Sequence, residues 1–102
     1  MTESVATLTL QDSRLHLGGV VHFDNAEKVC ADGVKLLKQA GKSLVIDMHG
    51  LASSNSLVVA ILVSWTRIAS SSQQNLHISH MPDKLRAIIR VSGLTTALPE
   101  LP

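Results

Sequence analysis

The chain of 102 residues opens with two short stretches in which apolar and polar positions alternate. Residues 5–10 read V-A-T-L-T-L and residues 14–21 read R-L-H-L-G-G-V-V, with the turn-forming Q-D-S between them. A period of two in residues of this kind is typical of strands. The pattern therefore predicts that a β-hairpin opens the domain.

After the hairpin the apolar positions recur at a spacing of three and four. This spacing starts at Asn25, a residue type that caps helices, and ends at Gly41. The apolar or small positions are Ala26, Val29, Cys30, Gly33, Leu37 and Ala40. The charged residues between them lie on the other side of the projection, so the segment predicts an amphipathic helix.

The remaining chain alternates strand and helix patterns. A continuous apolar run at 43–48 predicts a strand covered on both faces, 56–69 is long enough for a helix, and 75–81 alternates like a strand. Pro82 suits the first turn of a short helix over 83–91, which Gly93 ends.

The predicted order of elements is β-β-α-β-α-β-α. Helices between successive strands require right-handed crossovers onto a partly parallel sheet. We therefore expect a single α/β domain over residues 1–102, with a mixed sheet of about four strands and about three helices. Residues 94–102 are predicted to form a C-terminal tail.

Composition narrows the class of protein. Apolar residues make up 45% and charged residues 17%, which favours a folded core over disorder. The formal net charge is +1, the basic residues are scattered, and Phe23 and Trp65 are the only aromatic residues, so the sequence argues against a nucleic-acid surface. The lone Cys30 excludes an internal disulfide, and no apolar run approaches the roughly 20 residues of a membrane span, which predicts a cytoplasmic protein.

The sequence also lacks the patterns of the common catalytic sites. Neither phosphate-binding glycine motif occurs, and the serines at 53–56 lack the glycines of a nucleophile elbow. His77 and His80, three residues apart on a predicted strand, point to opposite faces and cannot share a metal ion. We expect a protein that is not an enzyme and that binds no metal or cofactor.

The stretch L-A-S-S-N-S-L-V-V-A-I-L, residues 51–62, raises a question because small polar residues run directly into an apolar helix. Ser54 or Asn55 is expected to be the N-cap of this helix, since side-chain oxygens of these types accept from its free N–H groups. Capping alone does not require the whole polar run.

A projection of this helix at 100° per residue separates two sides. One broad apolar side, which includes Leu62 and Trp65, can cover the sheet. The opposite side carries Ser56, Ala60, Ser64 and Arg67, with Val59 and Val63 on its shoulder. This side is unusually small and apolar for a surface in water, and it would let another backbone come close.

The strand with I-D-M, the short loop, and the serine at the start of an apolar helix resemble the STAS domain family, the fold of the anti-sigma factor antagonists. In that family the loop resembles D-[S/T]-[S/G]-G-L, with a phosphorylatable hydroxyl at the helix start. Asn55 stands at the position of the family's Asp and Ser56 at that of the hydroxyl. Leu57 and Val58 stand where small residues are usual, and the resemblance covers residues 5–94.

Within the STAS family, the short single domain, Ser64-Trp65 and the ending A-L-P-E-L-P look similar to the small subunit of bacterial phospholipid-trafficking ABC transporters. This implies a non-catalytic partner of the ATPase subunit, in a complex that includes the permease at the cytoplasmic face of the inner membrane. The docking residues would be Ser56, Val59, Ala60, Val63 and Arg67, called the helix ridge below. The alternative is a phosphorylation switch like that of the anti-sigma factor antagonists, acting through Ser56.

Overall fold

The structure is a computed structural model that describes residues 5–101. Its elements are β1 (Ala6–Gln11), β2 (Arg14–Gly19), α1 (Ala26–Gln39), β3 (Ser43–Asp47), α2 (Ser56–Ser71), β4 (Asn75–Ser79), α3 (Asp83–Val91) and the 3-10 helix η1 (Thr95–Ala97). The predicted order β-β-α-β-α-β-α is confirmed. Most strand and helix ends differ from the predicted ones by one or two residues.

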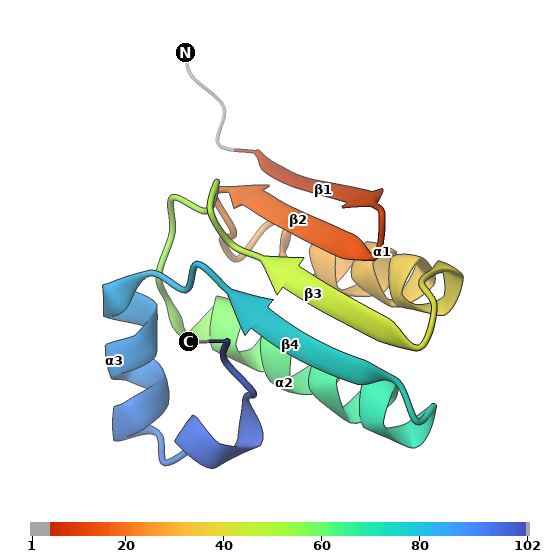
Figure 1. Cartoon of the computed structure of the whole chain (residues 1–102). Helices are drawn as coiled ribbons and strands as arrows, with labels where there is room; N and C mark the ends of the chain where they lie inside the picture. The colour runs from red at the N-terminus through yellow and green to blue at the C-terminus, as the bar shows by residue number, and fades with distance from the viewer. Residues whose placement is uncertain (1–4, 102) are drawn as a thin grey trace.

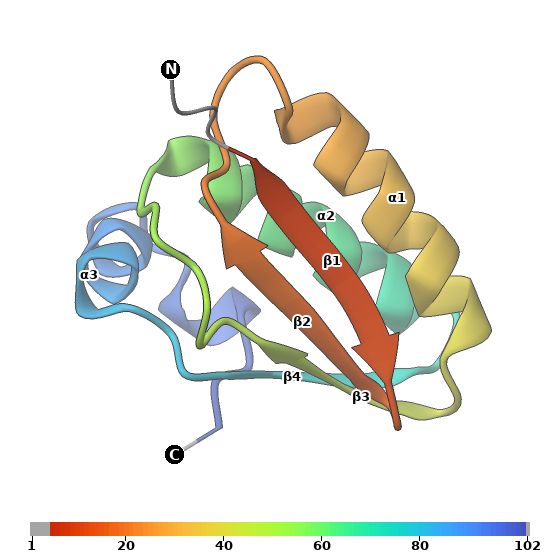
Figure 2. The same cartoon turned by 90° about the horizontal axis from the view of Figure 1, so that it is seen from above.

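The four strands form one mixed sheet in the order β1-β2-β3-β4. β1 pairs antiparallel with β2, whereas β2, β3 and β4 run parallel. Figures 1 and 2 show α1 and α2 side by side on one face of this sheet, with α3 beyond the end of β4. The parallel strands therefore direct both loops that lead into α2 and α3 to the same end of the sheet.

The β1–β2 hairpin turns through Asp12 and Ser13, whose φ angles are 49° and 64°. Two successive residues with positive φ are the mark of a type I′ turn, whose twist matches that of paired strands. Neither residue is Gly, but Asp tolerates this region better than most side chains. The Q-D-S signal in the sequence thus has a local conformational reason.

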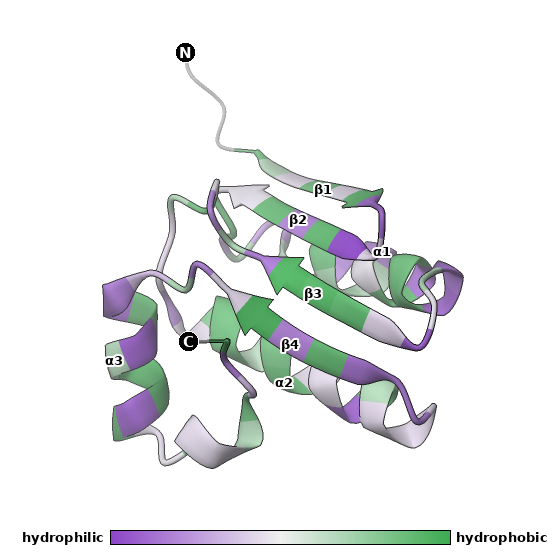
Figure 3. Cartoon of the chain, viewed as in Figure 1, coloured by the Kyte–Doolittle hydropathy of each residue, from purple (hydrophilic) through white to green (hydrophobic). Residues whose placement is uncertain are grey.

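The core lies between the sheet and the two long helices, where the apolar side of each element meets (Figure 3). Its largest fully buried side chains are Trp65, Leu15, Leu17, Leu44, Ile46, Met48, Leu62, Ile78 and Leu85. Trp65 lies against Gly33 of α1, and a Cβ atom at Gly33 would overlap the indole ring. The indole N–H also donates to the carbonyl of Cys30 at 3.0 Å, so α1 and α2 are in close contact.

Helix α1 begins directly after Asn25, but that side chain does not cap it. The Asn25 amide instead spans the preceding loop: it accepts from the His22 N–H and donates to the Val20 carbonyl, both at 2.9 Å. The backbone of Asn25 is already near helical, at φ −116° and ψ −7°, whereas a capping residue is usually extended. The expected capping role of this residue was therefore wrong.

The C-terminal segment is ordered against the sheet. After η1, the carbonyl of Pro99 accepts from the Ile78 N–H at 2.8 Å, and the Leu101 N–H donates to the Ile78 carbonyl at 2.7 Å. Leu98 is only 3% exposed, and Arg86 of α3 forms an ion pair with Glu100. Residues 99–101 thus lie along the outer edge of β4.

Candidate functional site

A groove of about 600 Å³ lies between α2 and the end of α3. It is lined by Ser56, Val59, Ala60, Val63, Ser64, Arg67 and Ile68 from α2, by Ile88 from α3, and by Ser92 and Leu94 after it. All five residues of the helix ridge line this groove. The structure thus brings the predicted docking residues to one concave surface.

The residues of the helix ridge differ in how much surface they offer. Ser56, Ala60 and Arg67 are exposed and Val63 is half-buried, but Val59 is only 5% exposed. Val59 therefore belongs to the core and forms the floor of the groove. Its role as a docking residue stays a prediction.

Sequence reasoning missed the second wall of the groove. Ile88 and Leu94 are half-buried and face α2 across the groove. The apolar stripe predicted for the last helix included Ile88, but a stripe does not reveal that part of it stays uncovered. The relative placement of α2 and α3 carried that information.

Ser53 and Asn55, two of the polar residues before α2, make different hydrogen bonds. Asn55 is the N-cap: its side-chain oxygen accepts from the Val58 N–H at 3.1 Å, and its amide donates to the Val21 carbonyl at 2.9 Å. The hydroxyl of Ser53 accepts from the Val21 N–H at 2.9 Å. Asn55 rather than Ser54 takes the cap position, and together these bonds join the start of α2 to the loop before α1.

Ser56 is the first residue of α2, and its side chain is exposed. The first turn of the helix carries no acidic residue, so its free N–H groups meet no negative charge of their own turn. Ser56 therefore lies where both a partner and a modifying enzyme have access to its hydroxyl.

The comparison with protein families decides the class of this domain. The model of the family described as Mlab, STAS domain matches residues 5–100. The chain belongs to the MlaB-type STAS domain family. No curated protein sequence matches the chain.

Solved structures agree with this STAS assignment. A chain of the Acinetobacter MlaFEDB complex in an ATP-bound conformation is similar with a TM-score of 0.81 and 28% identity, covering 93% of this chain and 99% of that one. The unphosphorylated anti-sigma factor antagonist SpoIIAA gives a TM-score of 0.71 at 14% identity, covering 96% and 89%. An anti-sigma factor antagonist from Mycobacterium paratuberculosis gives 0.73 at 15%, covering 98% and 86%. At these low identities the two antagonists show the shared fold.

Outside the groove, the STAS domain has a polar cluster around Asp47 at the end of β3. Asp47 is 7% exposed and accepts from the Arg14 guanidinium and from the His49 backbone N–H, both at 2.9 Å. The Nδ1 atom of His80 lies 3.1 Å from Asp47 Oδ1, the same oxygen that accepts from the His49 N–H. His49 begins the loop to α2 and His80 the loop to α3, so one carboxylate fixes both.

The charge of Asp47 follows from these contacts. Burial raises the pKa of this carboxyl, but the His49 N–H and the Arg14 guanidinium outweigh burial and hold the pKa below its usual value. Asp47 is thus ionised at neutral pH. It acts as a fixed acceptor for the two loops that lead into α2 and α3.

Among residues 5–101 no three His, Cys, Asp or Glu side chains are placed to hold a metal ion. Within the same range, no helix has the length and apolar character to cross a membrane. The groove on α2 and α3 is the candidate functional site because all five residues of the helix ridge line it.

Proposed function

We propose that this STAS domain is a non-catalytic accessory subunit of a bacterial phospholipid-trafficking ABC transporter of the Mla type. The observation that carries the proposal is the similarity to a chain of the Acinetobacter MlaFEDB complex, which spans 93% of this chain and 99% of the other. An accessory subunit of such a transporter acts by contact with its partner. The nucleotide chemistry then belongs to the ATPase subunit.

The helix ridge supplies the contact surface in this proposal. Ser56 and Ala60 are small, so the backbone of an opposing helix can approach α2 closely, and Val63 adds apolar area at the wall of the groove. Arg67 places one positive charge at the far end of the surface, where an acidic residue of the partner would fix the register. Through the ATPase subunit the domain is held at the permease and at the cytoplasmic face of the inner membrane.

The test of the ridge uses two alanines that are both exposed on helices. Ala60→Arg fills the groove, whereas Ala87→Arg makes the same change on α3 outside the groove. We expect the tagged Ala60→Arg chain, purified from detergent-solubilised membranes of its host, to lose the ATPase subunit and the permease. The Ala87→Arg chain should retain them, and thermal unfolding should show both variants folded.

Retention of the ATPase subunit by a folded Ala60→Arg chain would contradict the role of the helix ridge. If the unchanged chain brings down no ABC ATPase, the transporter assignment itself fails. Mass spectrometry of the purified partners separates these two outcomes.

The exposed position of Ser56 favours a second candidate function, a phosphorylation switch. A phosphate on the first turn of a helix meets free N–H groups and the positive end of the helix dipole. This function predicts a phosphoserine at 56 in cells and a large loss of partner affinity for Ser56→Asp. An unmodified peptide 53–56, together with unchanged affinity of Ser56→Asp, would remove this candidate.

A further inference from the structure

The two edge strands of the sheet, β1 and β4, differ in whether a further segment of the chain pairs with them. The edge of β4 is paired with residues 99–101 through Ile78. At the other edge, β1 pairs only with β2 among the described strands. Figure 1 shows the C-terminal segment beside β4 and no described segment along the outer side of β1.

The hydrogen-bond pattern identifies which groups of β1 face outward. The Val20 N–H donates to the Val5 carbonyl at 2.9 Å, so Val5 and Val20 form a hydrogen-bonded pair of the antiparallel ladder. Such pairs alternate along the strands. With the observed register, Thr7 and Thr9 point their backbone groups to β2, whereas Ala6, Leu8 and Leu10 point theirs outward.

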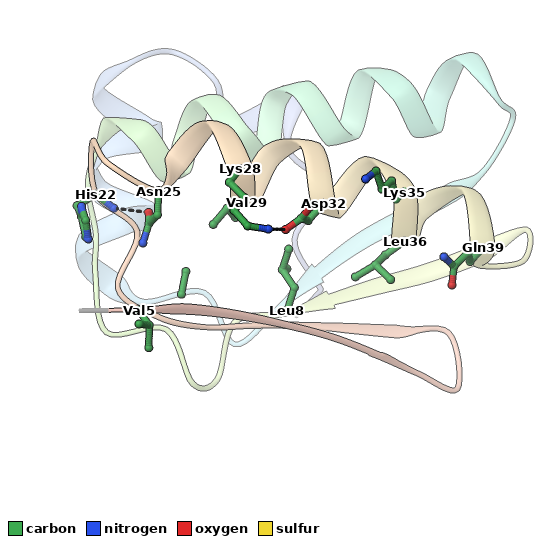
Figure 4. A pocket seen from close by; sticks show the side chains of 11 residues that line it. Val5, Leu8, His22, Asn25, Lys28, Val29, Asp32, Lys35, Leu36 and Gln39 are labelled. Carbon is green, nitrogen blue, oxygen red and sulfur yellow. Dashed lines mark hydrogen bonds and ion pairs between the residues drawn. The ribbon is translucent and has the colours of Figure 1, made fainter. Parts of the chain in front are cut away.

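A groove of about 520 Å³ runs beside this edge, between β1 and α1. Figure 4 shows Val5 and Leu8 on its strand side and Leu36 on its helix side. Lys28, Asp32 and Lys35 of α1 form the upper rim, where Lys28 and Asp32 make an ion pair at 2.7 Å (Figure 4). The groove thus combines an apolar floor, a rim with two lysines and one carboxylate, and a row of outward backbone groups.

We propose that this edge is a second docking site, which takes an extended, acidic segment of a partner polypeptide as an added strand. The outward groups of Ala6, Leu8 and Leu10 would pair with the backbone of that segment. Apolar side chains on alternate positions of the segment would enter the groove. Lys28 is already paired with Asp32 at 2.7 Å, so a carboxylate on the segment would meet Lys35, which gives the rim its net positive charge.

The closed edge of the same sheet provides an internal parallel. There, a short extended segment pairs with the backbone of Ile78, and its Glu100 meets a cation from the flanking helix, Arg86. At the open edge α1 takes the place of α3, and its lysines take the place of Arg86. An acidic extended segment is the occupant that repeats this arrangement.

The charges also distinguish this occupant from a second copy of the chain. Pairing of β1 with β1 of another copy would bring two α1 helices next to each other, and on each helix Lys35 remains positive beside the paired Lys28 and Asp32. Like charges at close range oppose such a dimer. The edge is thus better matched to a foreign acidic strand than to itself.

A hexapeptide of alternating Glu and Val tests this proposal, with a peptide of alternating Lys and Val as its matched control. Amide exchange measured by NMR reports each residue of β1 separately. At about ten times its Kd, the Glu peptide should slow exchange of the Ala6, Leu8 and Leu10 amides roughly tenfold. Thr7 and Thr9, already bonded to β2, should change little.

The rim is tested by reversing its charge. Lys28→Glu with Lys35→Glu should abolish protection by the Glu peptide, and Lys84→Glu on α3, outside the groove, should leave it unchanged. The proposal is overturned if millimolar Glu peptide protects none of the three amides, or if both peptides protect them equally. Protection that depends on protein concentration without peptide would show a dimer instead. Ala60→Arg should not alter this binding, so failure here is distinct from failure of the helix ridge.

Discussion

Helix α2 lies between two other helices, α1 and α3, and its contacts with them differ. On the α1 side Trp65 fills the space left by Gly33 and bonds to the Cys30 carbonyl, so the contact is closed. On the α3 side a groove remains beside Ala60. Gly33 thus allows α1 and α2 to pack closely within the chain. Ala60 instead leaves open space beside α2, which in our proposal the transporter ATPase fills.

The largest effect is expected where the closed flank is broken. Gly33→Val places a branched side chain against the Trp65 indole, and neither helix can move away without opening the core. We expect the free energy of unfolding to fall by about 3 kcal/mol. Urea unfolding measures this loss, and Gly41→Ala, where a Cβ meets nothing within 4 Å, is the control that should change it little.

The next largest effect is expected at the polar cluster around Asp47. Asp47→Asn weakens the charge-assisted bonds to Arg14 and the His49 N–H, and we expect a loss of roughly 2 kcal/mol at pH 7. The folded pKa of Asp47 is lowered, so its contribution is complete above the unfolded pKa of about 4 and is lost as the pH falls through the folded pKa. Melting temperatures of both proteins should therefore converge in acid. A constant difference from pH 7 down to pH 2 would contradict this account.

A smaller loss of stability is expected at the N-cap of α2, Asn55. Asn55→Ala removes the cap on Val58 and the bond to the Val21 carbonyl. We expect a loss of about 1 kcal/mol, the usual value for a cap. Chemical denaturation checks this value, and Ser54→Ala is the neighbouring control, since Asn55 holds the cap position.

The smallest effect on stability is expected on the open flank. Arg67→Ala removes an exposed side chain from the groove, and unfolding should change by less than about 0.5 kcal/mol. Association with the ATPase subunit should nevertheless slow, and the difference from the unchanged chain should shrink at high salt. Surface plasmon resonance at two salt concentrations measures both. An equal loss of stability and binding would place Arg67 in the fold instead.

Local patterns in the sequence carried most of the fold. The alternation in β1 and β2, the turn between them and the apolar side of α2 depend on neighbours a few residues apart, and these were predicted; the type I′ conformation of the turn was not. The pairing of residues 99–101 with Ile78 was not, because A-L-P-E-L-P has no strand alternation and its prolines carry no N–H. Only the position of β4 in space makes that segment extended.

The sequence also predicted the part of the candidate site that lies on a single helix, but not the part that depends on another helix. A helical projection places Ser56, Ala60 and Arg67 on one side of α2, and this holds in the structure. It cannot tell that Val59 is buried or that Ile88 completes the groove, because both depend on contacts between distant segments. Asn25 likewise has the composition of a cap, while its loop uses the amide for other bonds.

The turn at Asp12 and Ser13 also has a consequence for the order of folding. It joins strands that are neighbours in sequence, whereas β3 and β4 pair only after a whole helix has been placed between them. Hairpins close within about 1–10 μs, much faster than pairings that enclose long loops. We expect pulse-labelled amide exchange to find the β1–β2 amides protected first. Strand β1, with its open edge, would then be paired with β2 before α1 packs against the sheet. The folding rate would depend on how fast α1 packs there.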